Sequence, residues 1–300
     1  MQKKWYLKKR YWIGFLLLVF WLIVSNSEVF RFRYQPASFA KSIETSDSAK
    51  LIFKKKEVAT TTMNYCQLGN TLSQPLIVFV HGSPGSLAAF EGYLRDTLLS
   101  NRATLIAVDR LGFGYSDFGK AIPSLSLQAK LIATILQDFP EQPKIIVGHS
   151  MGGPVISKLA MDYPHLVDGL VLVAPSISPL LEPSNWWRKA FNFPILRWLT
   201  PAALRVCNQE IIPLEKELVD MENEWTNITC PVTVVQGTAD SLVPPGNAYY
   251  AKEQLSNSSN VELIMIAEGD HFILWNKYAL VRAAILEMLE EVKQGAKDVK

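Results

Sequence analysis

Short apolar runs alternate along most of the chain with segments whose apolar residues recur at helical spacing. Six runs are continuous enough for buried strands: 76–80, 105–108, 145–147, 170–174, 232–236 and 261–266. Helical periodicity follows at 87–99, 125–139, 155–160 and 276–294. This alternation predicts an α/β protein with a mostly parallel sheet, helices on both faces and right-handed connections.

Two further segments precede the first of these strands. Residues 51–53 and 58–66 have the composition of strands, and the lysines at 54–56 predict a solvated turn between them. These segments should add an antiparallel start to the sheet. We expect the core of the fold to comprise residues 50–177 and 228–295.

Residues 178–227 interrupt the alternation. They lie between two predicted strands and are rich in large aromatic residues and prolines: Trp186, Trp187, Phe191, Phe193, Trp198 and Trp225, with Pro179, Pro183, Pro194, Pro201 and Pro213. We predict a small, mostly helical cap over the ends of the strands. A pair of ordinary crossover helices is the alternative, which the length and the aromatic content disfavour.

The first 30 residues have a different composition. Five cations precede an uncharged, mostly apolar run at 11–24: Lys3, Lys4, Lys8, Lys9 and Arg10. This order predicts a transmembrane signal-anchor at 1–30, with the N-terminus cytoplasmic and the rest of the chain on the opposite side. The run is shorter than the roughly 20 residues of a typical span, so a signal peptide cleaved near Ser27, giving a secreted protein, is the alternative. Polar residues predict a linker at 31–49.

The charge of the chain and the spacing of its Cys and His residues argue against a nucleic acid partner. The net charge is +2, and we find neither a basic stripe nor a zinc-type spacing of Cys and His, so no nucleic acid partner is expected. No motif implies a metal or a cofactor. Cys66, Cys207 and Cys230 lie far apart and leave open whether any pair is bridged.

The strand predicted at 145–147 ends in Gly148-His149-Ser150-Met151-Gly152. Gly-x-Ser-x-Gly between a strand and a helix is the nucleophile elbow, a strained turn that raises the serine hydroxyl above the sheet. The flanking glycines are needed because side chains there would clash with the strand or the helix. A glycine-rich turn with an ordinary serine is the alternative, but the neighbouring strand and helix favour Ser150 as a nucleophile.

A serine nucleophile needs a histidine base, and that histidine needs an acid to orient it. His271 follows the last predicted strand, at the edge of the sheet where open α/β folds bind ligands. The other histidines lie beside Ser150 in the turn, in a glycine-rich loop or in a surface loop: His149, His81 and His165. We therefore predict that His271 is the base.

Asp240 is the best candidate for the orienting acid. It lies in the loop after a predicted strand, and the order Ser150, Asp240, His271 is the one that accompanies a nucleophile elbow. Glu268 and Asp270 are closer to His271 in sequence, but side chains of adjacent residues point apart. A turn or N-cap aspartate is the alternative role for Asp240.

Five motifs, in this order, resemble those of the α/β-hydrolase superfamily over about residues 50–295: His-Gly-Ser-Pro-Gly at 81–85, Asp-Arg-Leu-Gly-Phe-Gly-Tyr-Ser-Asp at 109–117, Gly-His-Ser-Met-Gly-Gly at 148–153, Gly-Thr-Ala-Asp at 237–240 and Gly-Asp-His at 269–271. The resemblance implies an α/β-hydrolase fold with a small cap. It also implies that the backbone N–H groups of Ser83 and Met151 form the oxyanion hole.

A serine at position 150 argues for acyl transfer, because the epoxide hydrolases and haloalkane dehalogenases of this superfamily use an aspartate nucleophile. With an aromatic cap, we expect a serine esterase or lipase-like hydrolase that cleaves carboxylic esters of hydrophobic acyl or alkyl groups through an acyl-enzyme. The His-Gly-x-Pro-Gly form also resembles proline iminopeptidases, so an aminopeptidase stays an alternative. Acidic residues in the cap are compatible with it: Glu210, Glu215, Glu217, Asp220, Glu222 and Glu224. A non-catalytic binding protein of the same fold is the other alternative.

Overall fold

The computed structural model describes residues 3–43, 50–69, 74–183 and 186–298. Its strands form one sheet in the order β1-β2-β4-β3-β5-β6-β7-β8. The strands are β1 (Leu51–Val58), β2 (Thr61–Leu68), β3 (Leu76–Val80), β4 (Thr104–Val108), β5 (Lys144–His149), β6 (Gly169–Val173), β7 (Val232–Gly237) and β8 (Val261–Ile266). Only the pairs β1–β2 and β2–β4 are antiparallel, so the predicted mostly parallel sheet is confirmed.

The lysine run does not form the predicted turn. Lys54 and Lys56 lie inside β1, which is the edge strand, and the chain reverses after Val58, where Ala59 has a φ of +53°. The ammonium of Lys54 donates to Gln67 Oε1 at 2.7 Å, and that of Lys56 pairs with an aspartate on a neighbouring loop. Lysines are common on edge strands because they discourage pairing with another chain.

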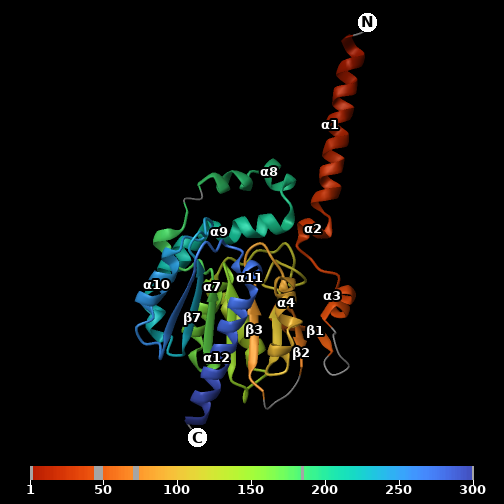
Figure 1. Ribbon diagram of the computed structural model, residues 1–300. Helices are drawn as coiled ribbons and strands as arrows, with labels where there is room; N and C mark the ends of the chain where they lie inside the picture. The colour runs from red at the N-terminus through yellow and green to blue at the C-terminus, as the bar shows by residue number, and fades with distance from the viewer. Residues whose placement is uncertain (1–2, 44–49, 70–73, 184–185, 299–300) are drawn as a thin grey trace.

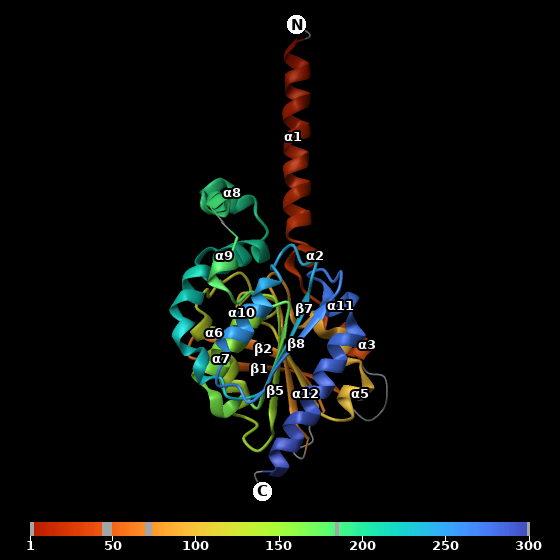
Figure 2. The ribbon, with the colours of Figure 1, turned by 60° about the vertical axis from the view of Figure 1, so that its left-hand side comes forward.

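Two layers of helices cover the sheet, as Figures 1 and 2 show, and a hydrophobic core lies on each face. One face carries α6 (Leu125–Leu136), α7 (Gly152–Asp162) and α10 (Gly246–Gln254). The other carries η1 (Leu87–Phe90), α4 (Glu91–Leu94), α5 (Thr97–Ser100), α11 (Ile273–Asn276) and α12 (Tyr278–Asp298). A short turn, η2 (Pro164–Leu166), leads into β6. The helix predicted at 87–99 is divided into the three short helices η1, α4 and α5. The last of them begins separately because Asp96 caps it by accepting from the Leu98 N–H.

The insertion predicted at 178–227 is helical where the structure describes it. Its helices are η3 (Pro179–Leu181), η4 (Trp186–Asn192), α8 (Pro194–Leu199), α9 (Ala202–Asp220) and η5 (Glu222–Asn227). Figure 2 shows α8 and α9 at the end of the sheet where the parallel strands terminate. Leu214 and Leu218 of α9 join the core of the α6–α7 face, while Val206 and Cys207 pack against Phe113. The long helix α9 thus attaches the cap to the body at the carboxyl ends of the parallel strands.

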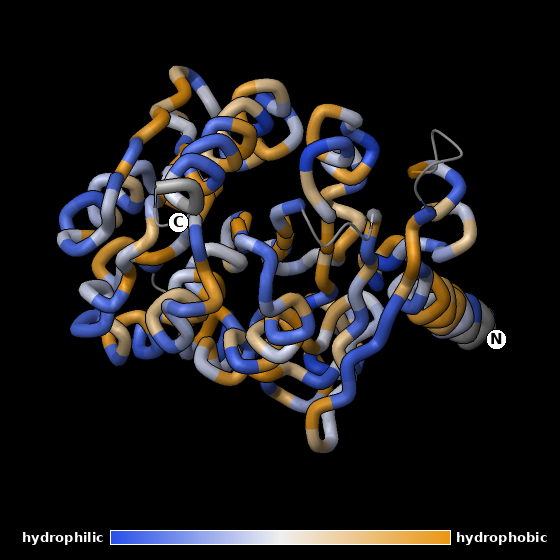
Figure 3. The backbone as a smooth tube through the Cα atoms, turned by 90° about the horizontal axis from the view of Figure 1, so that it is seen from below, coloured by the Kyte–Doolittle hydropathy of each residue, from blue (hydrophilic) through white to orange (hydrophobic). Residues whose placement is uncertain are grey.

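The N-terminal helix α1 (Lys3–Ser25) projects from the body of the protein (Figure 1), and Figure 3 shows it as a largely hydrophobic segment. Across the described residues, no helix combines the length and hydropathy that crossing a membrane requires. The predicted transmembrane segment at 1–30 is therefore not supported. The reason lies in the sequence, since the uncharged run at 11–24 is shorter than the roughly 20 residues of a span.

The predicted linker is wrong for residues 31–43. The helices α2 (Glu28–Arg31) and α3 (Pro36–Ile43) lead into the body, and the side chains of Tyr34, Phe39 and Ile43 are buried in the hydrophobic core of the sheet face that also carries η1 and α12. The prediction rested on the polar residues of this stretch and ignored the apolar ones between them. Residues 44–49 of the predicted linker lie outside the described part of the chain.

Candidate active site

Ser150 lies in a sharp turn between β5 and α7. Its φ is +53°, a left-handed conformation that costs free energy for a residue with a side chain. The two flanking glycines allow the turn, because a Cβ on Gly148 would lie 2.7 Å from the Gly152 carbonyl oxygen, and one on Gly152 would lie 2.3 Å from that of Val80. The turn therefore places Ser150 at the carboxyl end of β5, before the first residue of α7.

The structure brings the predicted base and acid to this serine. His271 Nε2 lies 3.0 Å from Ser150 Oγ, and His271 Nδ1 lies 2.8 Å from Asp240 Oδ2. The other oxygen of Asp240 accepts the N–H groups of Leu242 and Val243 at 2.9 and 2.8 Å. Burial alone would raise the pKa of Asp240, but the hydrogen bonds from His271 and the two amides outweigh it and lower that pKa. The carboxylate is thereby kept charged beside the imidazole.

The histidines that sequence reasoning set aside have other partners. His149 is buried, and its Nε2 lies 3.2 Å from the carbonyl oxygen of His271 rather than near Ser150. Burial, and then the proximity of His271, lower the pKa of His149 to about 3, so it remains neutral. His81 is also buried, and its Nε2 accepts the Arg110 N–H at 2.9 Å. Neither imidazole competes with His271 for the serine proton.

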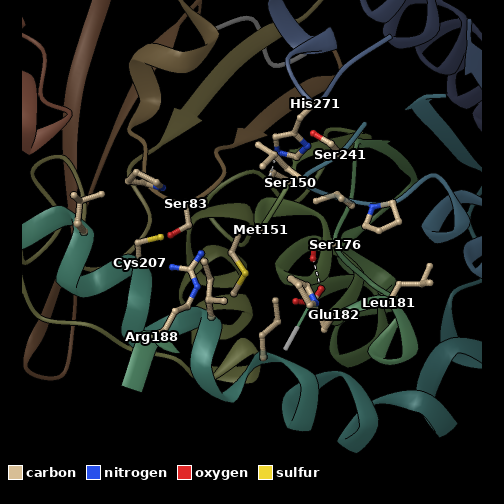
Figure 4. Close-up of a pocket in the computed structure, with 18 residues that line it drawn as sticks. Ser83, Ser150, Met151, Ser176, Leu181, Glu182, Arg188, Cys207, Ser241 and His271 are labelled. Atoms are coloured by element: carbon tan, nitrogen blue, oxygen red, sulfur yellow. Dashed lines mark hydrogen bonds between the residues drawn. The ribbon is translucent and has the colours of Figure 1, made fainter. Parts of the chain in front are cut away.

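Ser83 and Met151 line the same cavity as Ser150 and lie beside it in Figure 4. Met151 precedes the first residue of α7, so its N–H points from a helix N-terminus, where partial positive charge favours an oxyanion. The Ser83 hydroxyl is turned away from the nucleophile and donates to Glu210 Oε2 at 2.9 Å. The backbone N–H groups of Ser83 and Met151 as oxyanion donors stay a prediction.

Two cavities meet at Ser150, with volumes of about 560 and 540 Å³. They share five lining residues: Ser83, Pro84, Ser150, Leu242 and His271. The first, which we call the cap chamber, is also lined by four apolar residues of the cap, Leu181, Leu204, Ile211 and Leu214, and by Met151 and Val243 from outside the cap. The second, the N-terminal chamber, is also lined by Phe32, Arg33, Ala88, Ala89, Phe272 and Trp275. Both arms of a substrate centred on Ser150 would meet mainly apolar walls.

The cap chamber contains two charged side chains, both visible in Figure 4. Glu182 accepts a hydrogen bond from the Ser176 hydroxyl, and burial raises the pKa of this carboxyl. Arg188 donates to Asn208 Oδ1 at 2.7 Å, and its guanidinium stacks over the Trp187 ring. Sequence reasoning missed both residues, since only the fold of the cap brings them to Ser150.

The N-terminal chamber has a wall that the sequence prediction assigned to the linker. Phe32 lines it, and the next residue, Arg33, donates from Nε to the Gly114 carbonyl oxygen at 2.6 Å. The Arg33 guanidinium also lies over the rings of Tyr115 and Phe118. Aromatic and basic residues alternate from Phe30 to Tyr34, a pattern that could have indicated a packed segment.

The described residues contain no group of three or more His, Cys, Asp and Glu side chains arranged to hold a metal ion. Cys66, Cys207 and Cys230 are all described, and none of them is bridged.

Comparison with known proteins agrees with the fold. A family model described as the alpha/beta hydrolase fold matches residues 75–198. An uncharacterized protein of Mycobacterium tuberculosis is 36% identical over 102 residues, which are 34% of this chain and 29% of that protein. Monoglyceride lipase of Mus musculus is 23% identical over 245 residues, 70% of this chain and 79% of the lipase. The crystal structure of a membrane phospholipase A, described as a bacterial virulence factor, superposes with a TM-score of 0.64 at 18% identity, covering 95% of this chain and 99% of that one.

Proposed function

We propose that this chain, a member of the α/β-hydrolase superfamily, is a serine hydrolase that cleaves carboxylic esters of hydrophobic acyl or alkyl groups. The observation that carries the proposal is the continuous hydrogen-bonded path from Ser150 Oγ through His271 to Asp240. Ser150, where this path begins, has a strained backbone and lines both chambers, whose walls are mainly apolar. A nucleophile, a base and an orienting acid in this geometry can perform acyl transfer.

The proposed reaction has two halves. His271 Nε2 accepts the proton of Ser150 Oγ as that oxygen attacks the ester carbonyl, and the resulting imidazolium is stabilised by Asp240. The backbone N–H groups of Ser83 and Met151 bind the negatively charged oxygen of the tetrahedral intermediate, where each such donor is worth roughly 2.7–4 kcal/mol. As the intermediate collapses, the bond from the carbonyl carbon to the alkoxy oxygen breaks, the imidazolium protonates the departing alcohol, and the acyl group remains on Ser150 Oγ. Water, deprotonated by the same imidazole, hydrolyses the acyl-enzyme and restores Ser150.

The walls of the chambers support a hydrophobic substrate. Leu204, Ile211 and Leu214 line the cap chamber, and Phe272 and Trp275 line the N-terminal chamber. Similarity to a monoglyceride lipase agrees with this preference. Because an apolar pocket distinguishes one methylene by only about 1–3 kcal/mol, we expect broad acceptance of related esters.

An aminopeptidase is the second candidate, and Glu182 is the observation that favours it. Its carboxylate lines the cap chamber and could bind the ammonium group of a peptide. Two facts weigh against this role. The Glu182 carboxyl has a pKa raised by burial, and Glu210, another acidic residue of the cap, is fully buried in an ion pair with Arg110.

Labelling with a fluorophosphonate tests the nucleophile. Wild-type protein should be labelled, whereas Ser150→Ala should not. Equal labelling of both would place the nucleophile elsewhere, and failure to label either would favour a non-catalytic protein. A series of p-nitrophenyl esters of increasing chain length, measured beside proline p-nitroanilide, then separates the two enzymes. Turnover of the anilide alone would replace the esterase with an aminopeptidase.

The location of the protein is a separate proposal. We propose that α1 attaches the chain to a membrane and that the catalytic domain lies on the side opposite to the cytoplasm, with release by cleavage near Ser27 as the alternative. The basic residues ahead of the apolar run support export, and the exposed side chains of Leu17, Phe20 and Ile23 support attachment. Membrane fractionation with an alkaline carbonate wash tests it. Full-length protein in the soluble fraction would exclude attachment, and soluble protein that begins near Glu28 would favour cleavage.

A further inference from the structure

A buried ion pair joins the cap to the loop beside the nucleophile. Arg110, in the loop after β4, and Glu210, in the middle of α9, form two parallel hydrogen bonds. Nη1 lies 2.8 Å from Oε1 and Nη2 lies 3.0 Å from Oε2. The two side chains are 1% and 0% exposed, so water does not screen the pair.

The remaining donors of Arg110 hold the backbone that leads to Ser83. Its Nε donates to the His81 carbonyl oxygen at 2.8 Å, and its Nη2 also donates to that of Gly82 at 3.2 Å. The backbone N–H of Arg110 donates to His81 Nε2 at 2.9 Å. The carbonyl oxygen of Gly82 belongs to the same peptide group as the Ser83 N–H, so a shift of the guanidinium would move a proposed oxyanion donor.

Glu210 contacts the same loop directly. Its Oε2 accepts the Ser83 hydroxyl at 2.9 Å, and its Oε1 accepts the Gln128 side-chain amide at 3.1 Å. The Gln128 carbonyl oxygen in turn accepts Arg110 Nη1 at 2.7 Å. Each carboxylate oxygen of Glu210 therefore receives two donors, which fixes its position without any contact with Ser150.

The far end of this loop is held by the neighbour of Arg110. Asp109 Oδ1 accepts the Leu87 N–H at 2.8 Å. Two adjacent residues of the loop after β4 thus hold residues 81–87: Arg110 is bonded to the first residues of this segment and Asp109 to the last. Of these two residues, Arg110 is the one that also bonds to the cap. A buried ion pair is weak evidence for stability, because the cost of desolvating both charges offsets their attraction. A specific geometric role accounts better for its presence beside the nucleophile.

We propose that Glu210 is a positioning residue. Through Arg110 and the Ser83 hydroxyl it fixes the Gly82–Ser83 peptide group. The position of α9 therefore determines the geometry of the proposed oxyanion hole. This inference rests on the proposed serine-hydrolase function. It explains why a carboxylate that lines neither chamber is fully buried against the loop that carries Ser83.

The variant Glu210→Gln keeps the size of the side chain and removes its charge. We expect kcat for a p-nitrophenyl ester to fall about 10- to 100-fold, somewhat less than complete loss of an oxyanion donor. KM should stay nearly constant, because Glu210 does not line the chambers. Glu217→Gln is the matched control. Glu217 lies on the same helix and accepts the Leu125 N–H at 2.9 Å, outside this network, so the variant should keep the wild-type kcat.

The ratio of kcat for an ester to kcat for its thionoester tests the oxyanion hole specifically. A general destabilisation of the fold would lower both rates and leave this ratio unchanged. Well-placed N–H donors favour a developing oxyanion over a thiolate-like sulfur, so wild-type protein should strongly prefer the ester. In Glu210→Gln that preference should shrink about tenfold, in line with weakened oxyanion binding, and in Glu217→Gln it should not change. A folded Glu210→Gln protein with wild-type kcat and wild-type preference would overturn the positioning role.

Ser83→Ala serves if Glu210→Gln does not fold. It keeps the backbone N–H and removes only the hydroxyl that donates to Glu210, so we expect a smaller fall in kcat and a correspondingly smaller loss of ester preference. An unchanged preference would overturn the inference. Fluorophosphonate labelling of wild-type protein separates the two proposals. If wild-type protein is labelled and Glu210→Gln has wild-type kcat and ester preference, only the positioning role is wrong. If wild-type protein is not labelled, the serine-hydrolase function is wrong, and so is this inference.

Discussion

The phenol of Tyr34 donates a hydrogen bond to Asp109 Oδ2 at 3.1 Å and accepts one from Asn64 Nδ2 at 2.8 Å. Asp109 follows β4 and precedes Arg110, so a residue from the N-terminal segment contacts the loop that is hydrogen-bonded to residues 81–87. Residues 31–43 therefore belong to the packed body of the protein, and Phe32 also lines the N-terminal chamber.

The first prediction concerns where the chain can be shortened. A protein that begins at Ser27 should fold and hydrolyse esters, because it retains the buried side chains of Tyr34, Phe39 and Ile43. One that begins at Ser46 loses Tyr34, Phe39 and Ile43, each buried and each worth about 1.5–3 kcal/mol. That loss is comparable with the whole stability of a typical domain, about 5–15 kcal/mol. Thermal unfolding followed by circular dichroism should show a cooperative transition for the first protein and a much lower or absent one for the second. Equal melting temperatures would contradict the packing described here.

The second prediction concerns stability and pH. Burial raises the pKa of Asp109 to about 6, against its hydrogen bonds, which lower it. A carboxyl whose pKa is higher in the folded than in the unfolded state binds its proton more tightly when folded. Its contribution to stability is therefore fully present below about pH 4 and is lost as the pH rises through about 6.

Urea unfolding at pH 5 and pH 7 measures this contribution. The free energy of unfolding of wild-type protein, relative to that of Asp109→Asn, should be larger at pH 5. Asp138→Asn, which removes an exposed carboxylate paired with Lys56, is the control and should show no such pH dependence relative to wild type. A wild-type advantage that is larger at pH 7 would contradict the raised pKa.

The third prediction concerns the acid of the proposed triad. Asp240→Asn should lower kcat by about 10³–10⁴-fold with little change in KM, because an amide cannot hold His271 in the tautomer that accepts the serine proton. Asp270→Asn is the control. Asp270 is adjacent to His271 in sequence, but its carboxylate accepts the Phe272 N–H at 2.8 Å and does not face the imidazole Nδ1. Steady-state kinetics on one p-nitrophenyl ester distinguish them, and a larger loss in Asp270→Asn would reverse the assignment.

The sequence pattern correctly predicted the central strands and the turn at Ser150, because these elements depend on the residues of their own segment. Residues 76–80 and 145–147 are continuous apolar runs, and β3 and β5 are buried central strands because only such runs can be covered on both faces. The glycines around Ser150 also predicted a turn from local sequence, because the close backbone contacts of the turn leave no room for a Cβ atom at these positions.

Tertiary contacts decided what the sequence patterns did not predict. Lys54 and Lys56 are compatible with a turn or with an edge strand, and only the position of β1 beside β2 distinguishes these possibilities. Tyr34 and Phe39 stand among polar residues, so the surface that buries them had to be known first. Glu210 had the appearance of an ordinary acidic residue on a helix until α9 was placed against Arg110.

The fourth prediction concerns the two chambers, which should hold the two arms of an ester. Trp275 lines only the N-terminal chamber and is 45% exposed, so Trp275→Ala should change binding with little cost in stability. Ile211→Ala makes the corresponding change in the cap chamber, which Ile211 lines from α9.

Two ester series measure this prediction, one with a varied acyl chain and one with a varied alcohol. Each buried methylene is worth about 0.8 kcal/mol, or about fourfold in kcat/KM. Where an arm fills a chamber, lengthening that arm should raise kcat/KM by up to that factor per methylene. Each variant should flatten the dependence on chain length in one series only, and the two variants should affect different series, because the chambers meet only near Ser150. If both variants flattened the same series, both chambers would serve one arm, and the other arm of the ester would have to lie outside them, in solvent.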